Sequence, residues 1–228
     1  MRRGYGAPAL LCLCGLAYGA VAAGAAGAAT ELDRYLDGLM SLRTDFTQTV
    51  TDAQGAQIES GSGSLVVQRP DRFRWDYEPG AAGSGAAAAG NADQGGQLLV
   101  ADGSNLWFYD RELAQVTVKP IDAALSSTPI MLLSGSAATL RASFDIRAAG
   151  SHDGLQWVDV KPRSEQADFN DAQLGFKAGQ LARMVFHNAL GQNVQLDFAH
   201  SERNGRIDAA AFAFKAPAGV DVIGTPQH

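Results

Sequence analysis

Residues 65–77 decide the fold class, and they read Leu-Val-Val-Gln-Arg-Pro-Asp-Arg-Phe-Arg-Trp-Asp-Tyr. Apolar and polar side chains alternate along most of this stretch, which is the period of a β-strand. After Pro70, the side chains of Phe73, Trp75 and Tyr77 share one face, and charged side chains occupy the other. The stretch therefore predicts strands of an antiparallel sheet that is wet on one side.

Arg69 continues the alternation of Leu65 and Val67, so its side chain should point to the apolar side. An unpaired charge there would cost several kcal/mol. The five N–H donors of a guanidinium could instead satisfy backbone carbonyls. The alternative is an arginine that swings outward at a bulge made by Pro70.

Similar short runs recur along most of the chain. The segment 46–51 is rich in threonine and precedes a turn at 52–55, and 98–101 and 106–109 form a hairpin around Asp102-Gly103. Many short strands with turns between them indicate a large, curved antiparallel sheet. The remaining strand candidates are 116–118, 144–146, 156–160, 175–176, 181–186, 194–198 and 211–214.

Six aromatic residues of these strands are expected on the inner face: Phe73, Trp75, Tyr77, Trp107, Tyr109 and Trp157. They could form an ordinary core covered by helices, or the wall of an apolar cavity that stays partly unfilled. Periodicity does not separate these two interpretations.

Two segments have helical patterns. Thr30 to Asp33 match a capping box, and Leu32, Tyr35, Leu36, Leu39 and Met40 follow at helical spacing. In 120–135, Pro120 and Pro129 suit first helical positions, Thr128 an N-cap and Gly135 a stop. The apolar run 130–133 within this segment must be covered by something.

Residues 1–29 have the layout of a secretory signal peptide, with Arg2 and Arg3 before an apolar stretch and small residues at its end. An uncleaved membrane anchor is the alternative, although the stretch is short for a span. Cys12 and Cys14 both lie in this segment, and neither has a small residue before it for lipidation. We expect one periplasmic, monomeric domain over 30–228, interrupted by a flexible Gly/Ala-rich insertion at 79–96.

The sequence contains no recognisable catalytic or metal-binding constellation. Its four histidines are scattered, and no serine has the flanking glycines of a nucleophile elbow. Gly85 to Gly90 have the glycine spacing of a phosphate loop, but Asn91 and Ala92 replace its lysine and hydroxyl residue. The net charge of −6 also argues against a nucleic-acid partner. We therefore expect no enzyme activity, no metal and no cofactor.

The chain resembles the LolA family of periplasmic lipoprotein carriers over nearly all of residues 30–228. The resemblance lies in five stretches that follow the family's order, although relatives usually have a short connection in place of 79–96. These stretches are 46–52 (Phe-Thr-Gln-Thr-Val-Thr-Asp), 63–75 (from Gly-Ser-Leu-Val-Val-Gln-Arg-Pro to Phe-Arg-Trp), 100–109 (Val-Ala-Asp-Gly and Leu-Trp-Phe-Tyr), 128–133 (Thr-Pro-Ile-Met-Leu-Leu) and 212–220 (Phe-Ala-Phe-Lys-Ala-Pro-Ala-Gly-Val).

The resemblance implies a mainly-β α+β fold, an unclosed half-barrel of antiparallel strands with a helical lid over its apolar concave face. It also implies a chaperone that accepts acylated lipoproteins from an inner-membrane ABC transporter complex and delivers them to the outer-membrane receptor LolB. A periplasmic carrier or sensor of another lipid on the same fold is the nearest alternative, and an enzyme acting on lipids is a third.

Residue roles follow from the resemblance as well. Arg69 matches the arginine that latches the family's lid. Residues that match the wall of its acyl-chain cavity are Leu36, Phe46, Leu65, Val67, Phe73 and Trp75, and residues that match the lid are Ile130, Met131 and Leu132. For each wall residue, a role in the core alone stays the alternative.

Overall fold

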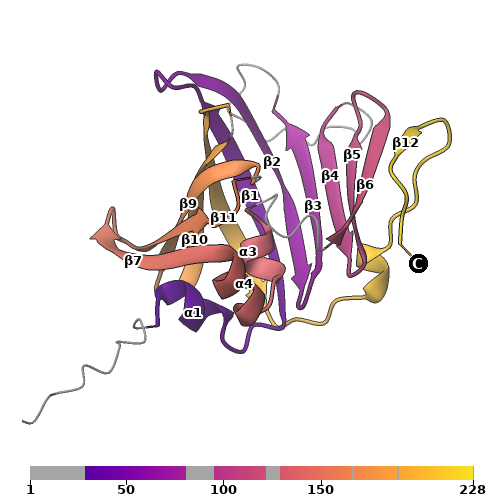
Figure 1. The fold of residues 1–228 in the computed structure, drawn as a ribbon. Coiled ribbons are helices and arrows are strands. Elements are labelled where there is room, and N and C mark those ends of the chain that lie inside the picture. Colours follow the sequence, from indigo (N-terminus) through magenta and orange to yellow (C-terminus); the bar gives the residue numbers. More distant parts are fainter. Residues whose placement is uncertain (1–28, 81–94, 122–128, 166, 189, 228) are drawn as a thin grey trace, which may run out of the picture.

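The computed structural model describes residues 29–80, 95–121, 129–165, 167–188 and 190–227. Within these ranges, one sheet of 12 strands curves around short helices (Figure 1). The strand order is β12-β6-β5-β4-β3-β2-β1-β11-β10-β9-β8-β7, so β12 and β7 form its two edges. All neighbours for which a register is defined are antiparallel except β12 and β6. The predicted unclosed antiparallel sheet with few helices is confirmed.

The strands are β1 (Ser41–Thr51), β2 (Gln57–Gln68), β3 (Arg72–Pro79), β4 (Gln97–Asp102), β5 (Asn105–Asp110), β6 (Gln115–Pro120), β7 (Phe144–His152), β8 (Leu155–Pro162), β9 (Phe169–Lys177), β10 (Gln180–Asn188), β11 (Asn193–Arg203) and β12 (Asp221–Ile223). The helices are α1 (Glu31–Leu36), α3 (Met131–Ser134), α4 (Ala137–Ser143) and the 3-10 helix η1 (Ala209–Phe212).

The register of the central strands builds a continuous apolar row on the concave face. Trp75 of β3 lies opposite Leu65 of β2 and Leu99 of β4, and Leu99 lies opposite Phe108 of β5. Residues that are paired across antiparallel strands project to the same side of the sheet. The alternation seen in residues 65–77 is thus carried across four strands to one face.

The first helix begins as predicted but ends earlier. The Thr30 and Asp33 side chains form the expected capping box. The helix stops at Leu36, because the backbone becomes extended at Asp37 and Gly38 has a φ of 67°. Met40 therefore leaves the apolar side of the helix and is 65% exposed, which corrects the longer helix that the spacing indicated.

Pro120 is not the first residue of a helix, although the sequence predicted this. It closes β6, where it pairs with Asn105 at the edge of the ladder, and the next residue, Ile121, is helical. Gly135 follows α3 directly, as predicted. Thr128 and most of the insertion predicted at 79–96 lie outside the described residues, and β3 and β4 flank that insertion.

Three aromatic residues face the side opposite to the one expected. Trp107 and Tyr109 on β5 project to the convex face, where their rings lie 5.4 and 6.2 Å from the Phe214 ring. Trp157 on β8 stacks on His152 at 4.9 Å, outside the main core cluster. On β5 both faces are apolar because the segment after β11 covers the convex side, so alternation alone could not tell the two faces apart. On β8 the cover of Trp157 is local, since His152 belongs to the neighbouring strand of the same hairpin.

The chain after β11 supplies much of that cover. Residues 211–214 were expected as a strand, but Asp208 caps the 3-10 helix η1, which ends at Phe212. Phe212 is buried against the sheet, and η1 contacts β3 and β4. The chain then returns along β6 as the short strand β12, which the sequence pattern did not indicate.

Candidate functional site

A cavity of about 450 Å³ lies between the concave face and the start of the segment 129–143, which we call the lid segment. It is lined mainly by apolar side chains, with polar groups at its margins. The lining residues are Gln48, Trp75, Gln97, Leu99, Leu106, Phe108, Thr117, Lys119, Pro129, Ile130, Asp168, Phe186 and Leu196.

Two of the residues predicted for the site line this cavity. Trp75 belongs to its wall and Ile130 to the lid side. The others are buried in one apolar cluster between the sheet and the helices: Leu36, Phe46, Leu65, Val67, Phe73, Met131 and Leu132. Their roles as acyl-chain wall and lid stay predictions, since a closed core uses the same side chains.

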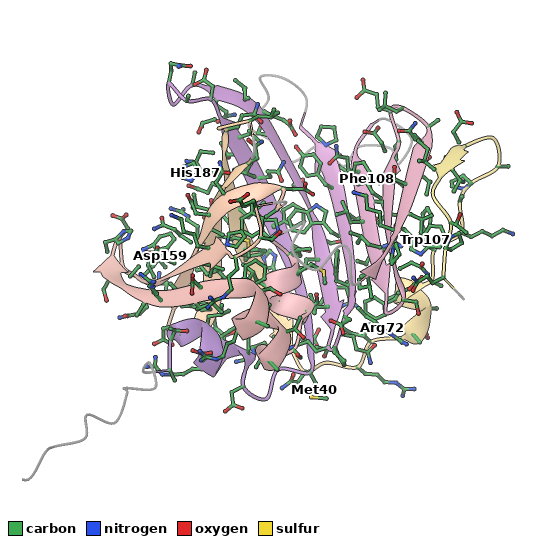
Figure 2. All side chains as sticks on the ribbon, viewed as in Figure 1. Met40, Arg72, Trp107, Phe108, Asp159 and His187 are labelled. Atoms are coloured by element: carbon green, nitrogen blue, oxygen red, sulfur yellow. The ribbon has the colours of Figure 1, made fainter. Side chains whose placement is uncertain are left out.

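The sequence pattern missed the β5 part of the wall. Leu106 and Phe108 line the cavity, whereas their neighbours Trp107 and Tyr109 had been expected to face inward. Trp107 and Phe108, both labelled in Figure 2, are adjacent on one strand and so project to opposite faces. Phe108 can be recognised as a wall residue because it pairs with Leu99, which in turn pairs with Trp75. These pairings are visible only once the register of the strands is known.

Arg69 joins the sheet to two helical segments. Its Nη1 donates to the carbonyl of Leu36 at 2.7 Å and to that of Leu39 at 3.5 Å, and its Nη2 donates to the carbonyl of Gly135 at 2.8 Å. Leu36 ends α1 and Gly135 ends α3, and the Arg69–Pro70 peptide bond is cis. The guanidinium thus meets helix C-termini, whose carbonyls lack partners within the helix and attract a cation.

The environment of Arg69 is partly apolar. Burial lowers the pKa of its guanidinium, and the nearby Asp71 carboxylate opposes this effect. Because a guanidinium is intrinsically a very strong base, the side chain stays charged at physiological pH. The side chain turns toward backbone carbonyls rather than outward at Pro70.

The lid segment rests on the sheet through its apolar residues. Met131, Leu132 and Leu133 are fully buried, although α3 has only four residues. A second tie joins α1 to α4, where Arg141 Nη2 donates to Asp33 Oδ1 at 2.6 Å. Sheet, α1 and the lid segment are therefore held together by both packing and directed polar contacts.

Gln48, a polar side chain that lines the cavity, lies beside a hydrogen-bonded pair formed by Tyr77 and Glu59. Tyr77 donates its hydroxyl to Glu59 Oε1 at 2.6 Å and also hydrogen-bonds the Gln48 side chain. Burial raises the pKa of Tyr77, and the bond to the Glu59 carboxylate raises it further. Tyr77 is therefore a neutral hydroxyl at physiological pH.

The part of the chain that the structure describes holds no group of three or more His, Cys, Asp or Glu side chains suited to a metal ion. None of its helices has the length and hydropathy needed to cross a bilayer.

A largely apolar cavity between a curved sheet and a helical segment is the kind of site that binds apolar ligands. The family model described as "Outer membrane lipoprotein carrier protein LolA" matches residues 37–82 and 92–215. The chain therefore belongs to the LolA family of outer-membrane lipoprotein carrier proteins. The break in this match, 83–91, lies within the Gly/Ala-rich insertion at 79–96.

Two carrier proteins with more than 30% sequence identity agree with this assignment. The chain is 37% identical to an outer-membrane lipoprotein carrier protein of Methylibium petroleiphilum, over 98% of this chain and 99% of the relative. It is 35% identical to the carrier of Dechloromonas aromatica, over 87% of this chain and 88% of the relative. A solved LolA superfamily protein from Nitrosomonas europaea covers 82% of this chain and 97% of its own length, with a TM-score of 0.44 and 10% identity.

Proteins of this family carry lipoproteins and are not enzymes. Family membership thus agrees with the expectation of a carrier that was drawn from the sequence.

Proposed function

We propose that this chain is a periplasmic chaperone that shelters the acyl chains of lipoproteins between its concave face and its lid segment. The observation that carries the proposal is the largely apolar cavity of about 450 Å³ beneath Pro129 and Ile130. Trp75, Leu99 and Phe108 provide part of its wall. Residues 1–29 would direct export and be removed, leaving 30–228 as one soluble carrier domain.

The direction of transport is also part of the proposal. The carrier would accept an acylated lipoprotein from an inner-membrane ABC transporter complex and deliver it to the outer-membrane receptor LolB. One long acyl chain gains on the order of 10 kcal/mol when it leaves water. Unassisted diffusion through an aqueous compartment is therefore negligible, and a soluble shelter is needed.

The shelter must also release its cargo. A lid that packs on the concave face in the empty state meets this need, because opening it subtracts from the binding free energy of the ligand. We propose that Arg69 sets part of this opening cost through its bonds to the carbonyls of Leu36 and Gly135. Met131 and Leu132 would be the lid side chains that acyl chains displace.

A displacement titration tests the cavity. The purified protein should bind an anilinonaphthalene dye, and a synthetic triacylated lipopeptide should displace it, whereas the same peptide without acyl chains should not. Phe108→Ser should weaken binding of the lipopeptide by about tenfold or more, the loss expected for a buried aromatic ring. Tyr109→Ser is the matched control, because Tyr109 lies on the same strand and faces the other side.

Equal effects of the two substitutions would contradict the proposed cavity, as would a wild-type protein that binds neither dye nor lipopeptide. Displacement by a glycolipid at lower concentrations than the lipopeptide would instead indicate a carrier of another lipid.

A further inference from the structure

Two polar side chains interrupt the apolar row on the inner face of β1: Thr44, which is buried and donates its hydroxyl to the Ala199 carbonyl, and Gln48. Phe46 and Val50 are 2% and 5% exposed, and Gln48 lies between them on the same face. Gln48 is paired across the strands with buried Leu196 of β11, and both line the cavity. A half-buried carboxamide in this position must be satisfied by hydrogen bonds, or it costs stability.

The Tyr77 hydroxyl satisfies part of the hydrogen-bonding capacity of Gln48. Because Tyr77 donates its proton to Glu59, its oxygen accepts from Gln48, which must use its NH₂ group. The Tyr77 ring is itself fixed over Gly61, where an added Cβ would lie 2.5 Å from the hydroxyl oxygen. The Gln48 amide therefore lies in the cavity wall beside the Tyr77 hydroxyl.

A carboxamide has two N–H donors and an acceptor oxygen, and Tyr77 uses one donor. The second donor and the oxygen are left for partners on the cavity side. An acylated polypeptide presents matching chemistry where its hydrocarbon chains begin, since ester and amide linkages carry carbonyl oxygens that accept hydrogen bonds. Bare hydrocarbon has no such group.

We infer that Gln48 binds an acyl carbonyl oxygen of the lipoprotein at the head of a sheltered chain. This rests on the proposed function and deepens it, since it assigns to one residue the distinction between an acylated polypeptide and a simple apolar molecule. The neutral amide suits an uncharged ester or amide carbonyl, and no full charge needs to be desolvated when the ligand enters.

The test compares three ligands on three proteins. The ligands are the anilinonaphthalene dye, the triacylated lipopeptide, and an analogue of that lipopeptide whose ester and amide acyl linkages are replaced by ether and amine linkages. The proteins are the wild type, Gln48→Leu and Gln195→Leu. Gln195 is the matched control, because it neighbours Leu196 on β11, projects to the other face, and hydrogen-bonds Asp197 at 2.7 Å.

Gln48→Leu should weaken binding of the triacylated lipopeptide by about fivefold, the loss expected for one neutral hydrogen bond. Its affinities for the dye and for the ether-amine analogue should stay within about twofold of the wild type. Gln195→Leu should bind all three ligands like the wild type. Circular dichroism and the midpoint of thermal unfolding would establish that each variant is folded.

Each other outcome has a distinct meaning. Equal losses for lipopeptide and analogue would overturn the carbonyl contact, since the substitution would then act on the shape of the cavity. Unchanged lipopeptide affinity in Gln48→Leu would overturn it too, while leaving the carrier function intact. A wild-type protein that binds none of the ligands would refute the proposed function and, with it, the role of Gln48.

Discussion

At the scale of single residues, charged side chains in this protein connect segments that are distant in sequence. Arg69 on the sheet side reaches the ends of α1 and α3, and Arg141 on α4 reaches Asp33 on α1. In each case the charged group meets a partner whose position only the folded chain defines. The alternation of Leu65, Val67 and Arg69 predicted the side of the sheet to which the Arg69 side chain points. Its acceptors, the carbonyls of Leu36 and Gly135, became apparent only in the structure.

Asp33 carries a pH dependence. Burial alone raises the pKa of its carboxyl, but hydrogen bonds from Thr30 and the charge of Arg141 outweigh this and lower the pKa below 3.8. A carboxyl whose pKa is lower in the folded state stabilises the fold above its unfolded pKa, and this contribution is lost as the pH falls through the folded pKa. The loss therefore begins near pH 3.8 and continues below it.

We expect Asp33→Asn to flatten the decrease in thermal unfolding midpoint that the wild type shows below about pH 4. Calorimetric scans from pH 2.5 to 6 would measure this. Arg141→Ala keeps the carboxyl but removes its cationic partner, so the folded pKa of Asp33 moves up toward 3.8, and the decrease should be smaller than in the wild type and level off at a higher pH. Parallel pH curves for all three proteins would show that the Asp33 contacts do not contribute.

At the scale of secondary-structure elements, close strand packing depends on glycines in β2. A Cβ on Gly63 would overlap the Asp76 carbonyl oxygen and lie 2.5 Å from Cζ of Phe46. The missing side chain lets Phe46 reach Trp75, with ring centroids 3.7 Å apart. The stacking of Phe46 on Trp75 therefore depends on Gly63, a residue that the hydrophobic pattern of the sequence does not mark.

The segment after β11 is the clearest case in which the sequence predicted the wrong type of secondary structure. Its apolar residues 211–214 resemble a short strand, but they form the end of η1 and an extended stretch that covers the convex face. Phe212 is buried there, on the side opposite to the cavity. Stability and ligand binding should therefore respond differently to changes at this residue.

Phe212→Ala should lower the free energy of unfolding by about 3 kcal/mol, as expected when a buried aromatic side chain is removed. Dye and lipopeptide affinities of the folded variant should stay within about twofold of the wild type, because no cavity wall is changed. Urea denaturation and the displacement titration measure the two quantities. A large loss of affinity without a loss of stability would place Phe212 in the site.

At the scale of the whole molecule, the proposed function makes the lid segment and the ligand competitors for the apolar surface of the concave face. Met131 and Leu132 are buried in the cluster between the sheet and the helices, and in the proposed function a ligand displaces them to bury more of its chains. The free energy of ligand binding is reduced by the cost of this opening. Arg69 raises that cost if its three hydrogen bonds break when the lid moves.

Arg69→Leu should therefore leave lipoprotein uptake intact and slow transfer to the receptor by about tenfold or more, since a decrease of 1.4 kcal/mol in opening cost tightens binding tenfold. Arg69→Lys should also slow transfer, because one ammonium group does not match two separated carbonyls as a planar fork does. Transfer of a labelled lipoprotein to purified receptor measures the rate.

Arg34→Leu is the control for this experiment, because Arg34 is an exposed arginine of α1 that pairs with Glu31. Its transfer rate should match the wild type. Transfer at the wild-type rate by Arg69→Leu would exclude the latch.

The sequence by itself determined most strand positions, the capped start of α1, the direction of the Arg69 side chain and the family. These depend on short-range periodicity and on motifs that local stereochemistry requires. It could not assign the faces of β5 and β8, where Trp107, Tyr109 and Trp157 turned out to lie on the convex side. Alternation defines two faces of a strand but not which one lies inward.

Only the tertiary structure decided the wall of the cavity. Leu106 and Phe108 join Trp75 there because the register of β3, β4 and β5 aligns them, and register is a relation between segments. The C-terminal segment covers the opposite face with Phe212 and Phe214, which makes both sides of the sheet apolar. When each face is buried by a distant part of the chain, hydrophobicity alone no longer marks the interior, and only the path of the chain does.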